Sequence, residues 1–144
     1  MFSKSCEYGL RAVIYIAQQT NQNVKVSLAT VSEEINSPQA FTGKILQQLT
    51  KNKIVKSIKG PYGGFIVEPK KMQTKISEVV YLFDGDNIYN GCGLGLKQCD
   101  ANSPCPLHYK FVEIRNNLKV MLESTTLQVL VNEINDSGVI WLKR

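Results

Sequence analysis

Residues 37–67 read SPQAFTGKILQQLTKNKIVKSIKGPYGGFIV, and this stretch decides the fold. Its first half repeats apolar residues at helical spacing, which predicts one buried helix face. These residues are Phe41, Ile45, Leu46 and Leu49. Its second half, residues 54–67, has β-branched runs on both sides of GPYGG, a pattern typical of a two-stranded hairpin with a glycine-rich turn. We expect a helix followed directly by this hairpin, which we call the wing, with residues 59–64 as the wing tip.

The start and the outer face of this helix carry further signals. Ser37 followed by Pro38 combines a capping side chain with a proline in the first turn, so we expect Ser37 to cap the helix. With the apolar stripe facing inward, the opposite face is polar and basic and carries no acidic residue. That face comprises Ala40, Gly43, Lys44, Gln47 and Lys51.

Two more helices are predicted upstream. From about Ser3 to Thr20, apolar residues recur every three or four positions, and Cys6 lies on this stripe as a small core residue. A shorter helix follows Ser27, which has the side chain of an N-cap. Three helices followed by a hairpin is the order of a winged helix-turn-helix. In that architecture the third helix enters the major groove and the hairpin lies on the backbone or the adjacent minor groove.

Positive charge is concentrated in the same region. Residues 1–71 hold ten basic and four acidic residues, a net charge of +6, whereas the rest of the chain holds seven basic and eight acidic residues, a net charge of −1. Between Ile35 and Val67 there are five lysines and no acidic residue. The charge taken by itself could also be explained by a lysine-rich face that is simply solvated. Its position on the two elements that would touch DNA favours nucleic-acid binding over a scaffold used only for protein contacts.

We therefore expect double-stranded DNA as a partner. Gln39 and Gln47 are the best base readers, because an amide pairs bidentately with adenine. Lys44, Lys51 and Arg11 are better suited to neutralising phosphates. The expected DNA-binding residues are Arg11, Ser37, Gln39, Ala40, Gly43, Lys44, Gln47, Lys51, Lys59, Gly60, Pro61, Tyr62 and Gly63, with Lys56 as a further phosphate contact.

Downstream of the wing, residues 76–83 predict a short amphipathic helix, and residues 87–106 have the composition of a loop. Apolar residues then recur at helical spacing from Leu107 to Ile134. A second copy of the chain is the economical cover for this stripe. The predicted fold is mainly α with a small β-hairpin: a winged helix-turn-helix at 1–84, a cysteine-rich cluster or sensor loop at 85–106 and a helical dimerisation region at 107–144.

The predicted loop holds three of the four cysteines. Cys92, Cys99 and Cys105 are followed by His108, the only histidine, so three thiols and an imidazole are available as ligands for an iron–sulfur cluster or zinc. The lack of a two-residue CxxC spacing argues against the zinc interpretation. Oxidant-sensing thiols and inert cysteines also remain open. A catalytic Cys105–His108 pair lacks an identifiable orienting group, so we expect no enzyme.

Apolar runs in the chain are too short for a membrane helix, and the N-terminus lacks the shape of a signal peptide. We therefore expect a cytoplasmic protein without a membrane partner. In a reducing compartment the four cysteines are not expected to form a disulfide framework.

Nearly the whole chain resembles the IscR/NsrR-type family of winged-helix transcriptional regulators, named for the iron–sulfur cluster regulator. The resemblance is carried by residues 3–12, 41–49 and 59–65 together with the series Cys92, Cys99, Cys105 and His108. It implies a homodimer paired through the long helix after His108. It also implies a [2Fe-2S] cluster, in some relatives [4Fe-4S], on the three cysteines with His108 completing the coordination, and repression or activation controlled by the state of the cluster.

Three positions depart from that family's pattern. Six residues separate Cys92 from Cys99 where five are common, which puts the ligand set in question. Gly43 stands where the IscR branch has a glutamate that takes part in operator discrimination. Lys59 replaces a frequent arginine and lacks the planar fork suited to a narrow minor groove. The resemblance therefore implies an operator different from that of the IscR branch.

Overall fold

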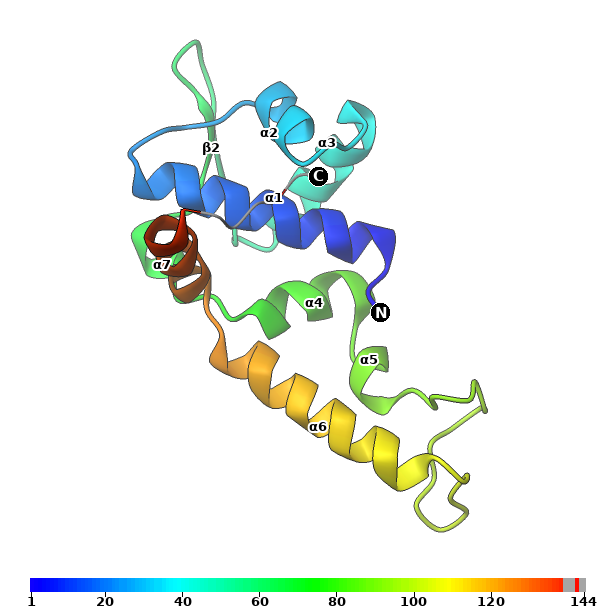
Figure 1. Cartoon of the computed structure of the whole chain (residues 1–144). Helices are drawn as coiled ribbons and strands as arrows, with labels where there is room; N and C mark the ends of the chain where they lie inside the picture. The colour runs from blue at the N-terminus through cyan, green and yellow to red at the C-terminus, as the bar shows by residue number, and fades with distance from the viewer. Residues whose placement is uncertain (139–141, 143–144) are drawn as a thin grey trace.

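The computed structural model describes residues 1–138 and 142, and its elements follow the predicted order (Figure 1). They are α1 (Lys4–Asn21), α2 (Leu28–Glu34), α3 (Gln39–Lys51), β1 (Lys56–Ile58), β2 (Gly64–Ile66), the 3₁₀ turn η1 (Pro69–Lys71), α4 (Ile76–Asp84), α5 (Asn87–Asn90), α6 (His108–Ser124) and α7 (Leu127–Ser137). β1 and β2 are antiparallel, with Ser57 opposite Phe65. The prediction of a mainly helical fold with one hairpin is confirmed.

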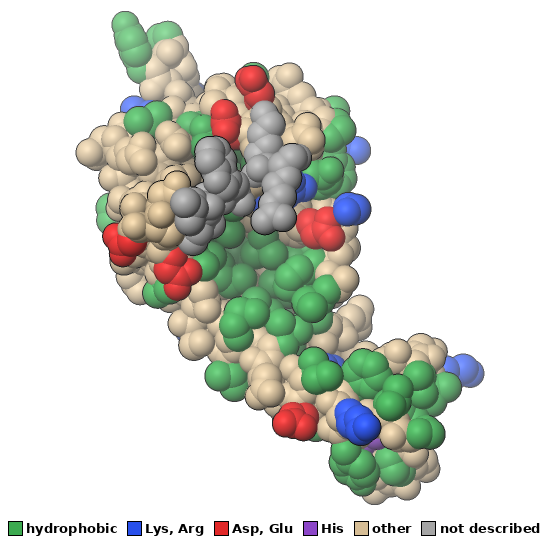
Figure 2. All heavy atoms as spheres, in the orientation of Figure 1, with side chains coloured by type: hydrophobic (Ala, Val, Ile, Leu, Met, Phe, Trp, Pro, Cys, Tyr) green, Lys and Arg blue, Asp and Glu red, His purple; other side chains and the backbone are tan. Residues whose placement is uncertain are grey.

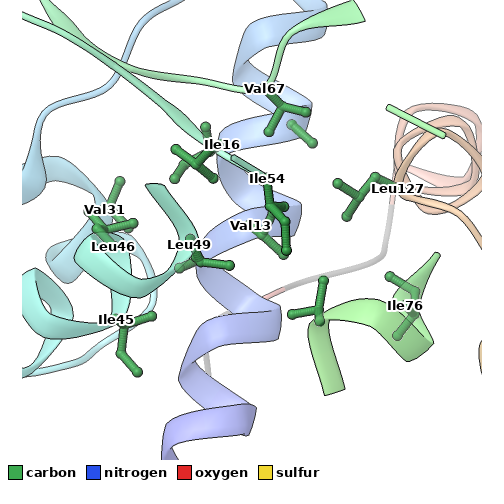
Figure 3. Close-up of a cluster of buried hydrophobic side chains, with 14 of the residues drawn as sticks. Val13, Ile16, Val31, Ile45, Leu46, Leu49, Ile54, Val67, Ile76 and Leu127 are labelled. Carbon is green, nitrogen blue, oxygen red and sulfur yellow. The ribbon is translucent and has the colours of Figure 1, made fainter. Parts of the chain in front are cut away.

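Helix α1 lies at the centre of the fold, with α2 and α3 on one side and α4 and α7 on the other (Figure 1). Val13 and Ile16 of α1 join side chains of α3 and Leu127 of α7 in one fully buried cluster (Figure 3). Cys6 has no exposed surface, which confirms the prediction that it is a core residue. One continuous core therefore connects the winged helix to the C-terminal helix.

The wing is attached to the body by backbone pairing. Phe65 N donates to Val26 O at 2.8 Å, so the segment before α2 is joined to β2 by a single antiparallel bridge. At the base of the wing, Val67 N donates to Thr20 Oγ1 of α1 at 3.1 Å. A Cβ on Gly64 would lie 2.9 Å from Val26 O, and the φ of Gly64 is +147°, so this junction needs glycine.

Two local predictions are wrong. The Ser37 side chain does not cap α3, because Pro38 is itself extended with ψ of 133° and the helix begins at Gln39. Ser37 N instead donates to Ser32 O at 2.9 Å. Residues 87–106 are not entirely loop, since 87–90 form the short helix α5, where Tyr89 N and Asn90 N donate to Asp86 O.

The predicted dimerisation region contains two helices that behave differently. They are separated at Thr125, whose carbonyl accepts from Ile76 N at 2.9 Å, while Leu127 N donates to Thr74 O at 3.0 Å. These bonds turn α7 back onto α1, where Val131 is buried. Helix α6 extends away from the body beside α4 and α5 (Figure 1). Residues 139–141 and 143–144 of the predicted region lie outside the described residues.

The crossing of α1 and α4 predicts the effect of one substitution. A Cβ on Gly9 would lie 2.2 Å from Phe83 Cε2, a ring packed within the core, so Gly9→Ala is expected to reduce the free energy of unfolding by about 1–3 kcal/mol. Urea unfolding followed by circular dichroism measures this.

Gly43→Ala is the control, because it makes the same change within a helix and its Cβ would lie 3.7 Å from Leu28 Cδ2, an ordinary contact. It is expected to be neutral or stabilising by about 1 kcal/mol. Equal destabilisation by both substitutions would contradict the steric account of Gly9.

Candidate functional site

The outer face of α3 is accessible along its length. Of the residues predicted to bind DNA, Gln39, Ala40, Lys44, Gln47 and Lys51 are exposed, while Ser37 and Gly43 are half-buried. The opposite face contributes Ile45, Leu46 and Leu49 to the core, and this burial fixes the rotation of the helix. The helix thus presents three amides (Gln39, Gln47 and Gln48) and two lysines to solvent without an acidic side chain among them.

The wing tip is also exposed to solvent and carries a lysine. Lys59, Gly60 and Pro61 are exposed, Gly63 is half-buried, and Tyr62 is 88% exposed. The turn is closed by a bond from Gly63 N to Gly60 O at 3.0 Å. A Cβ on Gly63 would lie 2.0 Å from Ile58 O, so no side chain fits there. The chain therefore projects an aromatic ring and a lysine on a narrow turn, a form suited to a DNA minor groove.

Lys25 was missed by the sequence reasoning. It precedes the Val26–Phe65 bridge, and its Nζ donates to Tyr62 O at 3.4 Å, which places its charge at the wing tip. Only the pairing of residue 26 with β2 brings it there. The long separation in sequence between Lys25 and the wing gave no signal.

Arg11 has contacts within the protein. Its Nη1 donates to Ile35 O at the end of α2 at 2.9 Å, and its guanidinium lies 4.4 Å from the centre of the Tyr8 ring. Tyr8 in turn packs edge-on against Phe41 of α3. Arg11 therefore connects α1, α2 and α3, and a phosphate would bind a side chain that is already oriented.

The predicted metal ligands form two groups at the loop that precedes α6. Cys99 Sγ lies 3.2 Å from His108 Nδ1 and 3.1 Å from Arg115 Nη2. Arg115 also donates to Gly91 O, so this one guanidinium holds both ends of residues 91–99. Cys92 and Cys105 form the second group. The Cys105 side chain lies close enough to the Cys92 thiol to lower its pKa.

The thiols have different environments. The pKa of Cys92 is lowered, first by the backbone N–H groups of Leu94 and Leu96 and then by Cys105 and Arg115. Burial raises the pKa of Cys6 to about 12, with a further contribution from Asp84. Cys92 is thus suited to thiolate chemistry, and Cys6 is not.

The fit of a metal group to this loop is chemical rather than geometric. Three thiols and one imidazole on a loop rich in glycine and proline are the donors that zinc or an iron–sulfur cluster takes. Among residues 1–138 and 142, however, no three His, Cys, Asp or Glu side chains are arranged to hold a metal ion. The two groups would have to close together to form one site.

The model of the Rrf2 family, described as iron-dependent transcriptional regulators, matches residues 2–133. The chain belongs to the Rrf2 family. A putative helix-turn-helix transcriptional regulator of Aquifex aeolicus is 31% identical over 92% of both chains. The regulator IscR of Photorhabdus laumondii is 25% identical over 87% of this chain and 75% of its own.

Solved structures show the same fold. CymR, the global cysteine regulator of B. subtilis, superposes with a TM-score of 0.74 over 92% of this chain and 97% of its own at 23% identity. IscR of T. potens superposes with a TM-score of 0.71 over 97% of this chain and 92% of its own at 19% identity. The relatives of this Rrf2 protein are transcriptional regulators and not enzymes, and such regulators bind DNA. Within the described residues, no helix has the length and apolarity to cross a membrane.

Alkylation distinguishes the core cysteine of this Rrf2 protein from those of the loop. With iodoacetamide at pH 8 the folded, metal-free protein is expected to be modified at Cys92, Cys99 and Cys105 but not at Cys6, because Cys6 is buried and its pKa is raised. In urea all four are expected to react. Mass spectrometry of tryptic peptides measures this.

The Cys6 thiol also makes the free energy of unfolding depend on pH. Because the thiol of Cys6 ionises less readily in the folded state, its contribution to stability is fully present below pH 9.0 and is lost as the pH rises toward about 12. Cys6→Ala is expected to flatten the fall in unfolding free energy above pH 9. Modification of Cys6 in the native protein at the rate of the loop cysteines would contradict this assignment.

Proposed function

We propose that this chain is a cytoplasmic, homodimeric transcriptional regulator that reads DNA with α3 and the wing and senses redox, nitric oxide or iron–sulfur status at the cysteine loop. The observations that carry the proposal are the acid-free exposed face of α3 and the exposed wing tip with Lys59 and Tyr62. Gln39, Ala40, Gly43 and Gln47 would face the bases, and Lys44, Lys51, Lys56 and Arg11 the phosphates. Ser37, Lys59, Gly60, Pro61, Tyr62 and Gly63 would complete the contact.

Helix α6 supports a homodimer. Only His108 and Leu122 are buried on it among its 17 residues, whereas Tyr109, Ile114, Val120 and Met121 are between 50% and 71% exposed. Figure 2 shows hydrophobic side chains exposed on the side of the molecule where Figure 1 places α4, α6 and the loop between α5 and α6. A second copy would cover this helix and set the spacing of the two recognition helices.

Cys92, Cys99, Cys105 and His108 would hold an iron–sulfur cluster, [2Fe-2S] by the resemblance. Such a cluster supplies one-electron redox chemistry and reactivity toward oxidants and nitric oxide. The chain's own residues would position it: Arg115 orients Cys99, and α6 begins at His108. A change at the loop would act on α6 directly, since the loop leads into that helix.

Thiol sensing without a cluster is the second candidate. The Cys99 contacts with His108 and Arg115, together with the lowered pKa of Cys92, favour it. A similar fold is also seen in the oxidised form of S. aureus CymR, which superposes with a TM-score of 0.67 at 20% identity. Zinc bound by the same four residues is a further form of this alternative.

Lys44→Ala tests the DNA interface. Loss of one phosphate contact is expected to weaken binding to all DNA sequences and to lower the slope of log K against log salt by about one unit. Fluorescence anisotropy with genomic fragments at several salt concentrations measures the slope. Lys97→Ala, which removes the same charge from the cysteine loop, is the control and is expected to leave the slope unchanged. If Lys44→Ala leaves the slope intact and relaxes one base preference, Lys44 reads a base.

Anaerobic purification tests the sensing site. The protein is expected to be coloured and to contain iron and acid-labile sulfide, and Cys92→Ser, Cys99→Ser or Cys105→Ser to lose both, while Cys6→Ser keeps them. Visible absorption and metal analysis measure this. A colourless protein with stoichiometric zinc, or with no metal and reversible oxidation of its thiols, would replace the cluster with the alternative and leave DNA binding intact.

The dimer is tested by charge on α6. Ile114→Glu combined with Met121→Glu is expected to convert a dimer into monomers, because both side chains would be buried against a second copy. Sedimentation velocity measures the mass. Glu113→Gln combined with Glu123→Gln alters charge on the same helix without adding charge to its apolar positions, and is expected to leave the dimer intact. A wild-type chain that sediments as a monomer contradicts the proposal.

A further inference from the structure

A pocket of about 350 Å³ lies at the base of the wing, where three separate segments meet. Thr50 and Lys53 come from the end of α3 and the turn after it, Lys56 and Ser57 from β1, and Glu68, Lys70 and Lys71 from the segment around η1. Of these residues, only Lys56 is among those proposed above to bind DNA.

The charge of this pocket is unbalanced. Four lysines face one carboxylate, Glu68, which accepts from Lys56 Nζ at 3.1 Å and lies 3.9 Å from Lys70 Nζ. Lys56 also lowers the pKa of Glu68, so this carboxylate stays ionised at neutral pH. A net charge of about +3 remains in the pocket, and an additional anion would relieve the repulsion among its lysines.

Lys53 has a backbone conformation that is unusual for lysine. Its φ is +59°, in the left-handed region, a conformation that glycine and asparagine adopt at lower cost than lysine. The turn between α3 and β1 does not therefore call for lysine on conformational grounds. Lys53 is one of the residues that line the pocket, so a lysine at this position adds a positive charge to the lining.

The pocket is separate from the parts of the chain assigned to base reading. Lys56 pairs with Ile66 at the end of the hairpin opposite the tip, about 13 Å from Gly60 at the spacing of an extended strand. Thr50 lies about 16 Å along α3 from Gln39 at the rise of an α-helix. A ligand at the pocket would contact the ends of both DNA-contacting elements without covering either reading surface.

We propose that this pocket binds a phosphate group, held by Lys53, Lys56, Lys70 and Lys71 with the Ser57 hydroxyl as a further donor. The phosphate can belong to a small phosphorylated ligand or to a DNA backbone. Glu68 competes with it for Lys56 and Lys70. The proposal depends on the lysines of the wing base and not on the cysteine loop.

Titration calorimetry of the full chain with pyrophosphate at low ionic strength tests the site. Saturable binding is expected with one site per chain. Lys53→Gln combined with Lys70→Gln is expected to weaken it about tenfold or more, since two charge-assisted contacts are lost. Glu68→Gln is expected to strengthen it, because both lysines are released. This gain of binding separates the proposal from simple misfolding.

Lys97→Gln combined with Lys110→Gln removes the same charge from exposed positions outside the pocket and serves as the control. Absence of saturable binding, an equal loss in the control, or weaker binding by Glu68→Gln overturns the proposal.

A second arm identifies the source of the phosphate. If a DNA backbone supplies it, excess duplex DNA displaces pyrophosphate, and the Lys53/Lys70 variant lowers the salt slope of DNA binding by about two units. If a small ligand supplies it, pyrophosphate still binds the DNA complex and the slope is unchanged. Both outcomes support a phosphate site and differ only in its natural ligand.

Discussion

Burial of α1 on two sides is the interaction on which the rest of the structure depends. One side of the helix packs against α2 and α3, which fixes the rotation of the recognition helix, and the other packs against α4 and α7. Val13 and Ile16 have no exposed surface, and burial of each contributes about 1.5–3 kcal/mol. Even the wing is attached here, through Thr20 and Val67. The positions of α3 and of the wing thus both depend on packing against one helix.

Much of this arrangement could be predicted from periodicity and turn chemistry. The apolar stripes of α1 and α3, the burial of Cys6 and the hairpin around Gly60–Gly64 are local signals that the structure confirms. The failures have local causes as well. Ser37 has the side chain of a cap, but the extended backbone of Pro38 moves the helix start past it.

Long-range contacts could not be predicted in this way. Nothing in the sequence near Lys25 indicates that a backbone bridge to Phe65 brings it to the wing tip. Arg115 likewise gives no signal, although it contacts Cys99 and Gly91 across a loop of glycines. Spacing indicated which donors the loop supplies, while their grouping into Cys99 with His108 and Cys92 with Cys105 depends on how the loop folds against α6.

The return of α7 onto α1 bears on how the molecule can be divided. Leu127 and Val131, which follow the cysteine loop and α6 in the chain, complete the core that begins with Val13 and Ile16. A fragment that stops before α6 would expose that side of α1 to water and lose the backbone bonds at Thr74 and Ile76. The winged-helix half and the C-terminal helices are therefore not exchangeable modules. A chimera that joins this wing to another regulator's C-terminal helices would need a matching apolar face for α1.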